Sequence, residues 1–576
     1  MLITNYITNA LRNIHNRKMF GFINILGIGI GVAVVILISV FVRDQLSYDK
    51  FWPSADQVFR LHTTLNSPAR EPSVSIQAQG PVRDALSRYF PDQISAATRF
   101  TEMPAIMNVD GKIFNETIHL TDPDTTDIFP LDTISGDLTA ALSGINGLAI
   151  NETLASKLFP DSDPIGKIVT LSIRRLTQDY QIKAVFKDLP GNTVLSFQAL
   201  VLIDEQAFPG RFDGWTSFSG PLYFKLNKNT LVNEINQNLV DFTDETVIIP
   251  EYTGSGGTAS DYIKYTTMAL PDLQLNADGW GEMKPTGDKV TIITFIAIAI
   301  FILLIASINF MNLLTAQSIQ RSYEVALRKV LGARRHQLIY QFLTEAFIIA
   351  SAGLLVGLSI VETVLPYYGE FLDRELVINY ADGFTIGTLL GLVIVVTLLG
   401  GLHPALVSSN ILPAKILRSN RSSKTVANVL SGNFLVVLQF SITISLVAST
   451  IIIYSQMSHM VNLDLGYNTD DKIIIKGMRS KGILEQQQVF NQELLRLDYI
   501  TQTTYSHGVP GIGANGSIIA LVPEQPNQDT VRVSVLGSDY NFLDTYSIAL
   551  LAGRYYNPGF ERDGMPEVGN VKPGEI

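Results

Sequence analysis

Apolar residues gather in long uninterrupted runs, and the first of these, Met19–Val42, contains 24 residues without a charge. At about 1.5 Å per residue a helix of this length reaches about 36 Å, more than the roughly 30 Å hydrocarbon core of a bilayer. A signal peptide has a shorter apolar region, followed by small residues at a cleavage site. Here Val42 leads into Arg43-Asp44-Gln45-Leu46, so the pattern predicts an uncleaved membrane helix.

Four further runs are similarly apolar: Val290–Leu314, Ala346–Val364 with the single charge Glu362, Phe384–Val407 with His403 as its one ionisable residue, and Phe434–Tyr454. A buried helix of a soluble protein explains one such run, but five runs of this length favour lipid as their surroundings. We therefore expect a bundle of membrane-spanning helices over residues 19–42, 290–314, 341–366, 384–408 and 433–456.

The short connections between these runs differ in charge. Lys and Arg without excess acid are concentrated in segments 1–18, 315–340 and 409–432, whereas segment 367–383 holds four acidic residues beside Arg374. Because cytoplasmic loops carry the excess of Lys and Arg, the N-terminus is expected in the cytoplasm. Residues 43–289 and 457–576 then lie outside.

The segment 43–289 alternates between strand-like and helix-like patterns. Val169–Ile173, Gln181–Phe186 and Leu222–Leu226 are rich in β-branched or aromatic residues and read as strands, while Asn151–Phe159 and Val232–Phe242 read as short helices. This predicts an α+β extracytoplasmic domain of one or two lobes.

A weak internal repeat accompanies this organisation. A shift of 417 residues places Asp122 on Asp539 and Gly136 on Gly553, and about the same shift places the first span on the fifth. The sequence therefore predicts an internal duplication whose second copy is incomplete, because only 23 residues follow Gly553. We interpret this as a truncated or frameshifted chain; a naturally short second domain is the alternative.

The amino-acid composition excludes several classes of function. Of 576 residues 47% are hydrophobic and 16% charged, against about 25% charged in ordinary soluble proteins. The net charge of −11 argues against nucleic-acid binding. The absence of cysteine excludes thiolate nucleophiles and cysteine metal sites, and the histidines lack metal-ligand spacing. No phosphate-binding Gly-x-x-x-x-Gly-Lys-Ser/Thr motif occurs, so this chain is not itself expected to bind ATP.

The segment after the second run is the most informative one. It reads Arg321-Ser-Tyr-Glu-Val-Ala-Leu-Arg-Lys-Val-Leu-Gly332-Ala-Arg-Arg335, in which apolar residues alternate with charges in a way that suits a short amphipathic helix ended by Gly332. Such a helix offers apolar side chains and cations to a partner on the cytoplasmic side. A solvated positive loop is the alternative.

These segments resemble the permease subunits of the MacB-like, FtsX-like class of ABC transporters. Phe22-Ile-Asn-Ile-Leu-Gly-Ile, Ile308-Asn-Phe-Met-Asn and the segment 321–335 resemble the spans and the coupling helix of that family, and Asn151–Phe159 with Asp163–Lys167 resembles its periplasmic core domain. The end of the fourth run, His403-Pro-Ala-Leu-Val-Ser-Ser, is similar as well. The chain departs from the pattern at Ala326, where the family commonly has Gly.

The resemblance implies a non-catalytic permease of a bacterial inner membrane. A separate cytoplasmic ATPase dimer would bind ATP and Mg, this chain holding no cofactor, and its closure would move the periplasmic domain through the coupling helix. Carried over by position, the ATPase contacts are Arg321, Glu324, Val325, Leu327, Arg328, Lys329, Leu331, Gly332 and Arg334.

The substrate stays open among a peptide, a lipid, a lipoprotein and a drug-like molecule. Two alternatives to export remain. The chain could be an FtsX-like regulator that transmits ATPase motion to a periplasmic enzyme, or a membrane-anchored peptide sensor. A periplasmic partner protein fits each of them.

Overall fold

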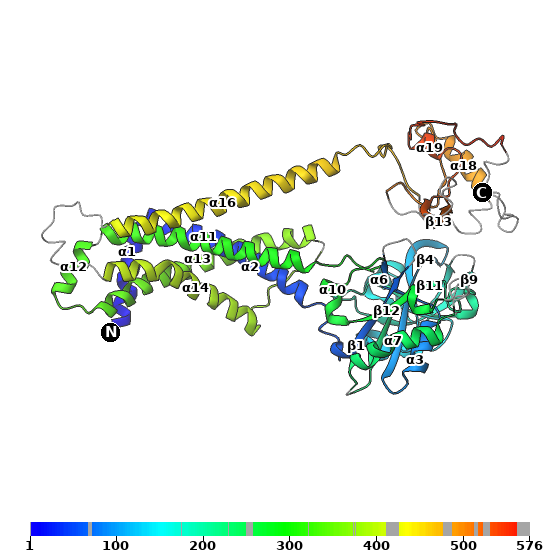
Figure 1. Cartoon of the computed structure of the whole chain (residues 1–576), viewed down its shortest axis with the longest axis horizontal. Coiled ribbons are helices and arrows are strands. Elements are labelled where there is room, and N and C mark those ends of the chain that lie inside the picture. Colours follow the sequence, from blue (N-terminus) through cyan, green and yellow to red (C-terminus); the bar gives the residue numbers. More distant parts are fainter. Residues whose placement is uncertain are drawn as a thin grey trace.

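The computed structural model describes residues 2–66, 72–173, 176–228, 230–248, 257–320, 322–372, 374, 376–409, 426–475, 478, 486–511, 516–521 and 530–560. Long helices lie side by side along the molecule, a β-rich domain occupies one end, and a smaller unit follows the last long helix (Figure 1). The fold thus separates apolar helices from a water-facing domain.

Five of the described helices are long and apolar enough to cross a membrane, as predicted. They are α2 (Lys18–Leu46), α11 (Lys289–Gln320), α13 (Arg335–Leu372), α14 (Gly383–Ser409) and α16 (Val426–Val461). Each extends beyond its apolar run, α14 by only one residue at its start and two at its end, because a helix continues into the polar interface once its backbone hydrogen bonds are formed.

Small residues let α2 and α13 approach each other closely. A Cβ atom added at Gly353 would lie 2.7 Å from the Ile28 side chain, and one added at Gly357 would lie 2.9 Å from the carbonyl oxygen of Gly29. Lipid supplies no hydrophobic force between helices, so close van der Waals packing at small residues is the main source of association.

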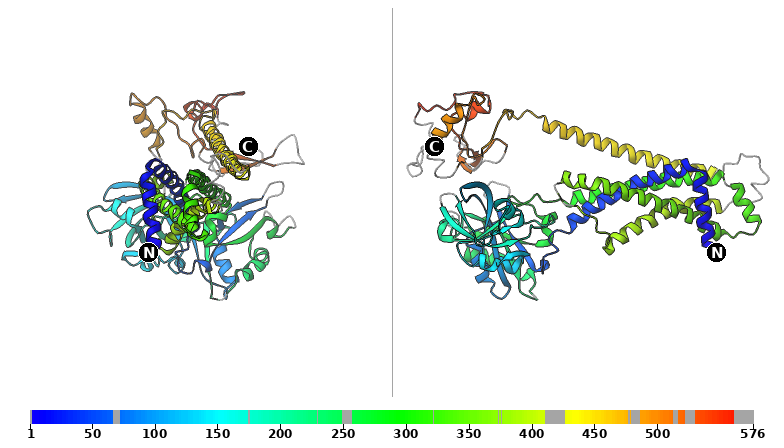
Figure 2. Two further views of the ribbon diagram at one scale, coloured as in Figure 1. Left: turned by 90° about the vertical axis from the view of Figure 1, so that its left-hand side faces the viewer. Right: turned by 180° about the vertical axis from the view of Figure 1, so that it is seen from behind.

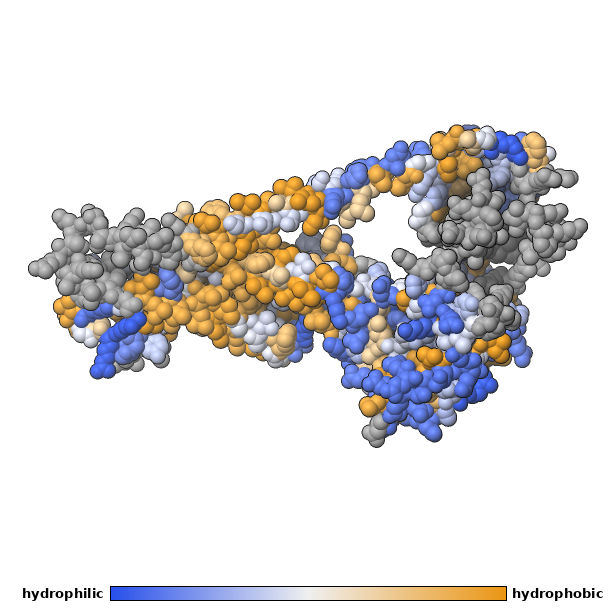
Figure 3. Space-filling view, viewed as in Figure 1, coloured by the Kyte–Doolittle hydropathy of each residue, from blue (hydrophilic) through white to orange (hydrophobic). Residues whose placement is uncertain are grey.

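The surface of this helical body is apolar over its length, whereas the β-rich domain is mostly hydrophilic (Figure 3). In the most apolar part of α16, none of the described side chains is buried within the protein. The lengths and this surface together describe a multi-pass membrane protein.

Two short helices lie at the end of the bundle opposite to the β-rich domain. They are α1 (Leu2–Asn16), which the sequence analysis did not anticipate, and α12 (Ser322–Val330). Figure 2 shows α1 running across the direction of α2 rather than along it.

The β-rich domain is built on one twelve-stranded sheet in the order β12-β1-β11-β4-β5-β10-β7-β9-β6, with β2, β3 and β8 paired beside that path. The bounds are β1 (Val58–Leu65), β2 (Ser73–Ser75), β3 (Gln77–Gln79), β4 (Ile94–Val109), β5 (Lys112–Thr121), β6 (Thr133–Gly136), β7 (Gly147–Asn151), β8 (Ile168–Ile173), β9 (Leu176–Phe186), β10 (Ala199–Leu202), β11 (Phe218–Leu226) and β12 (Ile263–Ala269). The three predicted strands fall inside β8, β9 and β11.

Helices cover this sheet in two places. α3 (Val82–Tyr89) and α7 (Val232–Thr246) pack against β1, β11 and β12, and α6 (Glu152–Leu158) packs against β7 and β9. The remaining short elements of the domain are η1 (Ala55–Gln57), α4 (Thr125–Ile128), α5 (Leu138–Ala141), η2 (Glu205–Ala207), α9 (Ala259–Tyr262), η3 (Leu270–Asp272) and α10 (Leu273–Asn276). The two helices predicted in this segment are α6 and α7, so that prediction is confirmed.

Strand β4 belongs to both halves of the domain. Its first part, up to Arg99, pairs with β11, and from Phe100 onward it pairs with β5. Strand β4 therefore contributes to the core around α3 and α7 and to the core around α6, and Phe100, at the change of partner, belongs to a third cluster with Tyr48 and Phe129.

The smaller unit after α16 contains α18 (Gln487–Leu495), the hairpin of β13 (Gly516–Leu521) with β14 (Thr530–Val535), and α19 (Phe542–Thr545). It has few buried side chains among those described, of which Phe542 and Tyr546 are two.

Candidate functional site

Helix α12 forms for local reasons. Glu324 lies one turn before Arg328, and their side chains form an ion pair of 2.6 Å, a spacing that supports an exposed helix. At its C-terminal end Gly332 has φ of +96°, the amide of Ala333 donates to the carbonyl of Arg328, and that of Gly332 donates to Lys329. This is the glycine-terminated end that the sequence predicts.

The two faces of α12 differ. Val325 is only 4% exposed and Ala326 is fully buried, so this face packs on the rest of the protein. The opposite face presents the large apolar side chains of Tyr323, Leu327 and Val330, and Leu331, in the turn that directly follows the helix, is 79% exposed beside them. We call these four residues the apolar face of α12.

The cations of α12 are held by neighbouring helices. The Arg328 guanidinium donates to the Gln341 side chain of α13 at 2.8 Å, and the Lys329 ammonium donates to the carbonyl of Ser409 at the end of α14 at 2.6 Å. Arg335 also reaches the Ser409 hydroxyl, at 3.4 Å. Burial, with the charge of Arg335 as a smaller cause, lowers the pKa of Lys329. Movement of α12 would therefore act on both α13 and α14.

The structure sorts the residues that the sequence analysis assigned to this site. Leu327 and Leu331 point outward, Arg328 and Lys329 connect α12 to other helices, and Arg321 lies outside the described residues. Val325 lies on the packed face, so we assign it to anchoring the helix and not to a surface contact.

Val330 counts among the apolar positions of the predicted helix but is not assigned to the ATPase contact, and Tyr323 is assigned to neither. Both lie at helical spacing from Leu327, which would have grouped the three. The departure at Ala326 is accommodated, because its small side chain fits within the packed face. Arg334 follows the glycine turn, where its backbone amide donates to the Gln337 side chain at 2.9 Å.

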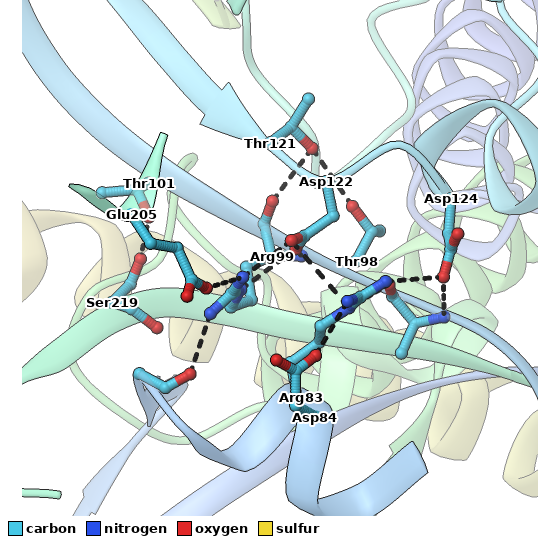
Figure 4. A network of polar contacts seen from close by, with 12 residues as sticks. Arg83, Asp84, Thr98, Arg99, Thr101, Thr121, Asp122, Asp124, Glu205 and Ser219 are labelled. Atoms are coloured by element: carbon cyan, nitrogen blue, oxygen red, sulfur yellow. Dashed lines mark hydrogen bonds and ion pairs between the residues drawn. The ribbon is translucent and has the colours of Figure 1, made fainter. Parts of the chain in front are cut away.

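A second polar cluster lies inside the β-rich domain, where β4 changes its pairing partner. Arg99, 2% exposed, donates to Asp122 at 2.7 Å, to Glu205 at 3.0 Å and to the carbonyl of Gly80 at 2.8 Å (Figure 4). Next to it Arg83 pairs with Asp124 at 2.8 Å. These partners satisfy the donors of the buried Arg99 guanidinium. Because they come from separate segments on either side of β4, the cluster links the two halves of the domain.

The described residues contain no group of three or more His, Asp or Glu side chains suited to a metal ion. Two buried histidines of the domain are kept neutral. Burial lowers the pKa of His119 to about 4, and burial together with the charge of Arg60 lowers the pKa of His62 to about 3. These groups bear on the stability of the domain.

Comparison with known families matches two parts of the chain. Residues 22–242 match the family described as MacB-like periplasmic core domain, and residues 296–413 match the FtsX-like permease C-terminal family. The second match covers α12 and the helices on either side of it. An FtsX-like permease domain is the non-catalytic membrane part of a transporter.

Curated relatives agree with these families. The macrolide export ATP-binding/permease protein MacB of Neisseria gonorrhoeae is 24% identical over 224 residues, which are 39% of this chain and 31% of that protein. The uncharacterized ABC transporter permease YknZ of Bacillus subtilis is 28% identical over 211 residues, 37% of this chain and 47% of that protein. The chain thus matches less than half the length of either relative.

Two solved structures are similar to part of the chain. A domain of a putative permease protein from Porphyromonas gingivalis has a TM-score of 0.33 at 21% identity, covering 43% of this chain and 99% of that one. The periplasmic region of MacB from Actinobacillus actinomycetemcomitans has a TM-score of 0.27 at 15% identity, covering 39% and 95%.

Proposed function

We propose that this chain, an ABC transporter permease of the MacB/FtsX type, transmits the movement of a separate cytoplasmic ATPase dimer to its periplasmic domain. The observation that supports this is the placement of α12: a helix with an outward apolar face, attached to α13 and α14, at the end of the bundle opposite to the β-rich domain (Figure 1). ATP and Mg would bind to that partner and not to this chain.

The proposal includes an orientation, in which the N-terminus and α12 face the cytoplasm and the β-rich domain faces the periplasm. The chain has no cysteine, so single cysteines report accessibility cleanly. In intact cells a membrane-impermeant maleimide should label Ser143→Cys, on the domain, and should leave Tyr323→Cys unlabelled until the cells are opened. The reverse pattern would overturn the orientation.

The ATPase contact is tested on the apolar face of α12. Leu331 is the most exposed of its four residues, so Leu331→Asp should leave the bundle intact and weaken co-purification of the ATPase at least tenfold. Leu231→Asp is the matched control, since Leu231 is 67% exposed on the β-rich domain. Equal ATPase recovery with both variants would contradict the proposal.

The double variant Arg328→Glu with Lys329→Glu tests whether α12 acts through α13 and α14. Because both cations bind to neighbouring helices, this variant should keep ATPase binding better than Leu331→Asp but lose the stimulation of ATP hydrolysis. Retention of full stimulation would show that α12 does not act through α13 and α14.

Export, regulation and sensing differ in their partners. For an exporter of a peptide, lipid, lipoprotein or drug-like molecule, purification in mild detergent should yield the ATPase, and solute movement should require ATP. Recovery of a periplasmic hydrolase without solute movement would favour the regulator, and recovery of a histidine kinase would favour the peptide sensor.

We also propose that the segment from α16 onward is a second copy of the unit that begins at α2. Ser506 pairs with Ser538 as Phe100 pairs with Thr121 in the first unit. In each unit the next residue is an aspartate, and its carboxylate accepts a backbone amide of the opposite segment: Asp122 from Arg99 at 2.7 Å, and Asp539 from Tyr505 at 3.1 Å.

The two units continue alike. Each aspartate is followed by a short helix, α4 or α19, and by a buried aromatic residue, Phe129 or Tyr546. Gly136 and Gly553 then adopt positive φ of +82° and +89°, a conformation that favours glycine. A helix also precedes each paired segment, α3 in the first unit and α18 in the second. In this reading one chain supplies both halves of a permease pair.

Introduced disulfides test the second copy. Ser506→Cys with Ser538→Cys should oxidise readily, because residues directly opposite in an antiparallel pair have Cα atoms about 4.5–5.5 Å apart. Phe100→Cys with Thr121→Cys is the corresponding pair in the first unit, and Ser506→Cys with Tyr540→Cys is the control out of register. Preferential oxidation of the control would reject the duplication.

A further inference from the structure

The outer end of α2, where the chain enters the β-rich domain, meets the connection between α13 and α14. The Asp44 carboxylate forms an ion pair of 2.7 Å with Arg374 of that connection. The same guanidinium donates to the Tyr48 hydroxyl and lies over the Tyr48 ring, 5.3 Å from its centroid. We call Asp44, Tyr48 and Arg374 the outer junction.

On one side the outer junction is part of the domain core. Tyr48 is buried in the same apolar cluster as Trp52 and Phe129. Burial raises the pKa of Tyr48, although Arg374 opposes the rise, so its hydroxyl keeps its proton and accepts the guanidinium hydrogen bond with its oxygen. A displacement of Tyr48 would therefore also displace the residues of this core that it contacts.

The turn after Tyr48 is fixed to the domain by Asp49. This residue is fully buried with φ of +56°, a strained backbone conformation for a residue other than glycine. Its carboxylate accepts from the Trp52 indole at 3.0 Å, from the amide of Val194 at 3.0 Å and from the Thr193 hydroxyl. Because three donors from two segments hold it, the turn cannot slide over the domain without breaking them.

On the other side the outer junction belongs to α13. The Arg374 amide donates to the carbonyl of Gly369 at 2.9 Å, and a Cβ atom on Gly369 would lie 2.7 Å from the carbonyl oxygen of Arg374. Arg374 therefore follows the outer end of this helix. The inner end begins at Arg335, and its first turns include Gln341, which binds Arg328 of α12.

One helix thus runs from the α12 contact to the outer junction. We infer that the outer junction is where displacement of α13 is passed to the periplasmic domain, with Arg374 as the positioning residue. This inference rests on the proposed function, because it needs an ATPase that moves α12. The pair suits the role: a charge-assisted contact with little exposure holds one geometry, and removal of the cation leaves Asp44 without this partner.

The test follows the domain relative to α13 in the full chain, reconstituted in lipid nanodiscs with the ATPase that co-purifies with it. Spin labels on Ser143→Cys and Leu355→Cys report the distance between the domain and α13. We expect that distance to change on addition of Mg-ATP with vanadate. In Arg374→Gln the nucleotide-free distance should stay the same and the ATP-dependent change should fall at least twofold, with ATPase binding unaltered.

Arg43→Gln is the matched control. Arg43 lies at the same level and pairs with Asp382 before α14 at 2.9 Å, but it is an exposed contact without the Tyr48 hydrogen bond. This control should keep the full ATP-dependent change. Tyr48→Phe keeps the ring and removes the hydroxyl, so it should reduce the change less than Arg374→Gln and serves if that variant fails to fold.

The outcomes separate the two proposals. If the unaltered chain recruits no ATPase, the proposed function fails and the inference with it. If the ATPase binds but the distance does not change in the unaltered chain, or if Arg374→Gln and Tyr48→Phe both keep the full change, the outer junction is overturned while the proposed function stands.

Discussion

The bundle of membrane helices and the β-rich domain are each stabilised by a different kind of internal contact. Between α2 and α13, Gly29, Gly353 and Gly357 let the two helices pack so closely that a Cβ atom at any of them would clash with the facing helix. Within the domain the contacts are clustered aromatic rings and buried ion pairs such as Arg99–Asp122. The helices also enclose a cluster of buried apolar side chains, but burial from lipid brings no hydrophobic gain, whereas burial from water does. The hydrophobic effect therefore stabilises the apolar cores of the domain and not the contacts between the membrane helices.

This contrast can be measured region by region. The three tryptophans of the chain, Trp52, Trp215 and Trp280, all lie in the β-rich domain. Tryptophan fluorescence during unfolding therefore reports the domain and not the helices.

The largest effect is expected at Arg99. Arg99→Met removes the cation and leaves the Asp122 carboxylate buried without that partner, which costs about 3–5 kcal/mol of unfolding free energy. Fluorescence-monitored denaturation should show the loss. The Lys157 side chain is 54% exposed in its pair with Glu116, so Lys157→Met should change the free energy of unfolding by less than about 1 kcal/mol. Equal losses would mean that burial does not set the strength of these pairs.

The next effect is a dependence on pH that only the domain should show. An unfolded chain protonates histidine near pH 6.5, whereas the folded domain keeps His119 neutral down to about pH 4 and His62 neutral down to about pH 3. The unfolded state then binds more protons, so the domain loses stability as pH falls from about 7 through this range. For His119 the loss amounts to about 3 kcal/mol.

His119→Leu should remove its share and flatten the dependence of the melting temperature on pH between 6.5 and 4. His336→Leu, which alters an exposed histidine at the start of α13, should leave the profile unchanged. An unchanged profile in His119→Leu would refute the assignment.

A smaller effect is expected at the helix contact. Gly357→Leu places a side chain where even a Cβ atom would lie only 2.9 Å from the Gly29 carbonyl oxygen, and overpacking of this kind costs about 1–3 kcal/mol. The variant should lose helical signal in detergent at lower temperature, with an unchanged fluorescence transition of the domain. Gly391→Leu, which meets nothing within 4 Å, is the control. Loss of the domain transition in Gly357→Leu would mean that the two regions unfold together.

The smallest effect concerns a single cap in the domain. The Asn151 side chain accepts from the Leu154 amide at 2.9 Å at the start of α6, so Asn151→Ala should cost about 1 kcal/mol. Asn151→Asp keeps an acceptor and should retain most of that stability in the same denaturation experiment. A loss as large as in Arg99→Met would show that Asn151 does more than cap α6.

Much of the architecture could be predicted from local pattern. Apolar runs of about bilayer length, four of them uncharged and one with the single charge Glu362, identify the five long helices. Alternation identifies β8, β9 and β11, because both signals depend on neighbours in the chain. The site was predicted in part. The glycine end of α12 was visible, but the inward side of Val325 was not, because an isolated amphipathic helix does not show which neighbours cover it.

The role of Arg374 could not be predicted from the sequence. In the sequence Arg374 is the single cation of an acidic connection. The low number of Lys and Arg residues there helps to predict the orientation of the chain in the membrane. Asp44 and Tyr48, the partners of Arg374, stand more than 320 residues away, and only the packing of α2 against α13 brings them within reach. Hydropathy and charge act through the solvent around each segment and can be read in order along the chain. A contact between distant segments depends on how the whole chain packs, and that the tertiary structure alone decided.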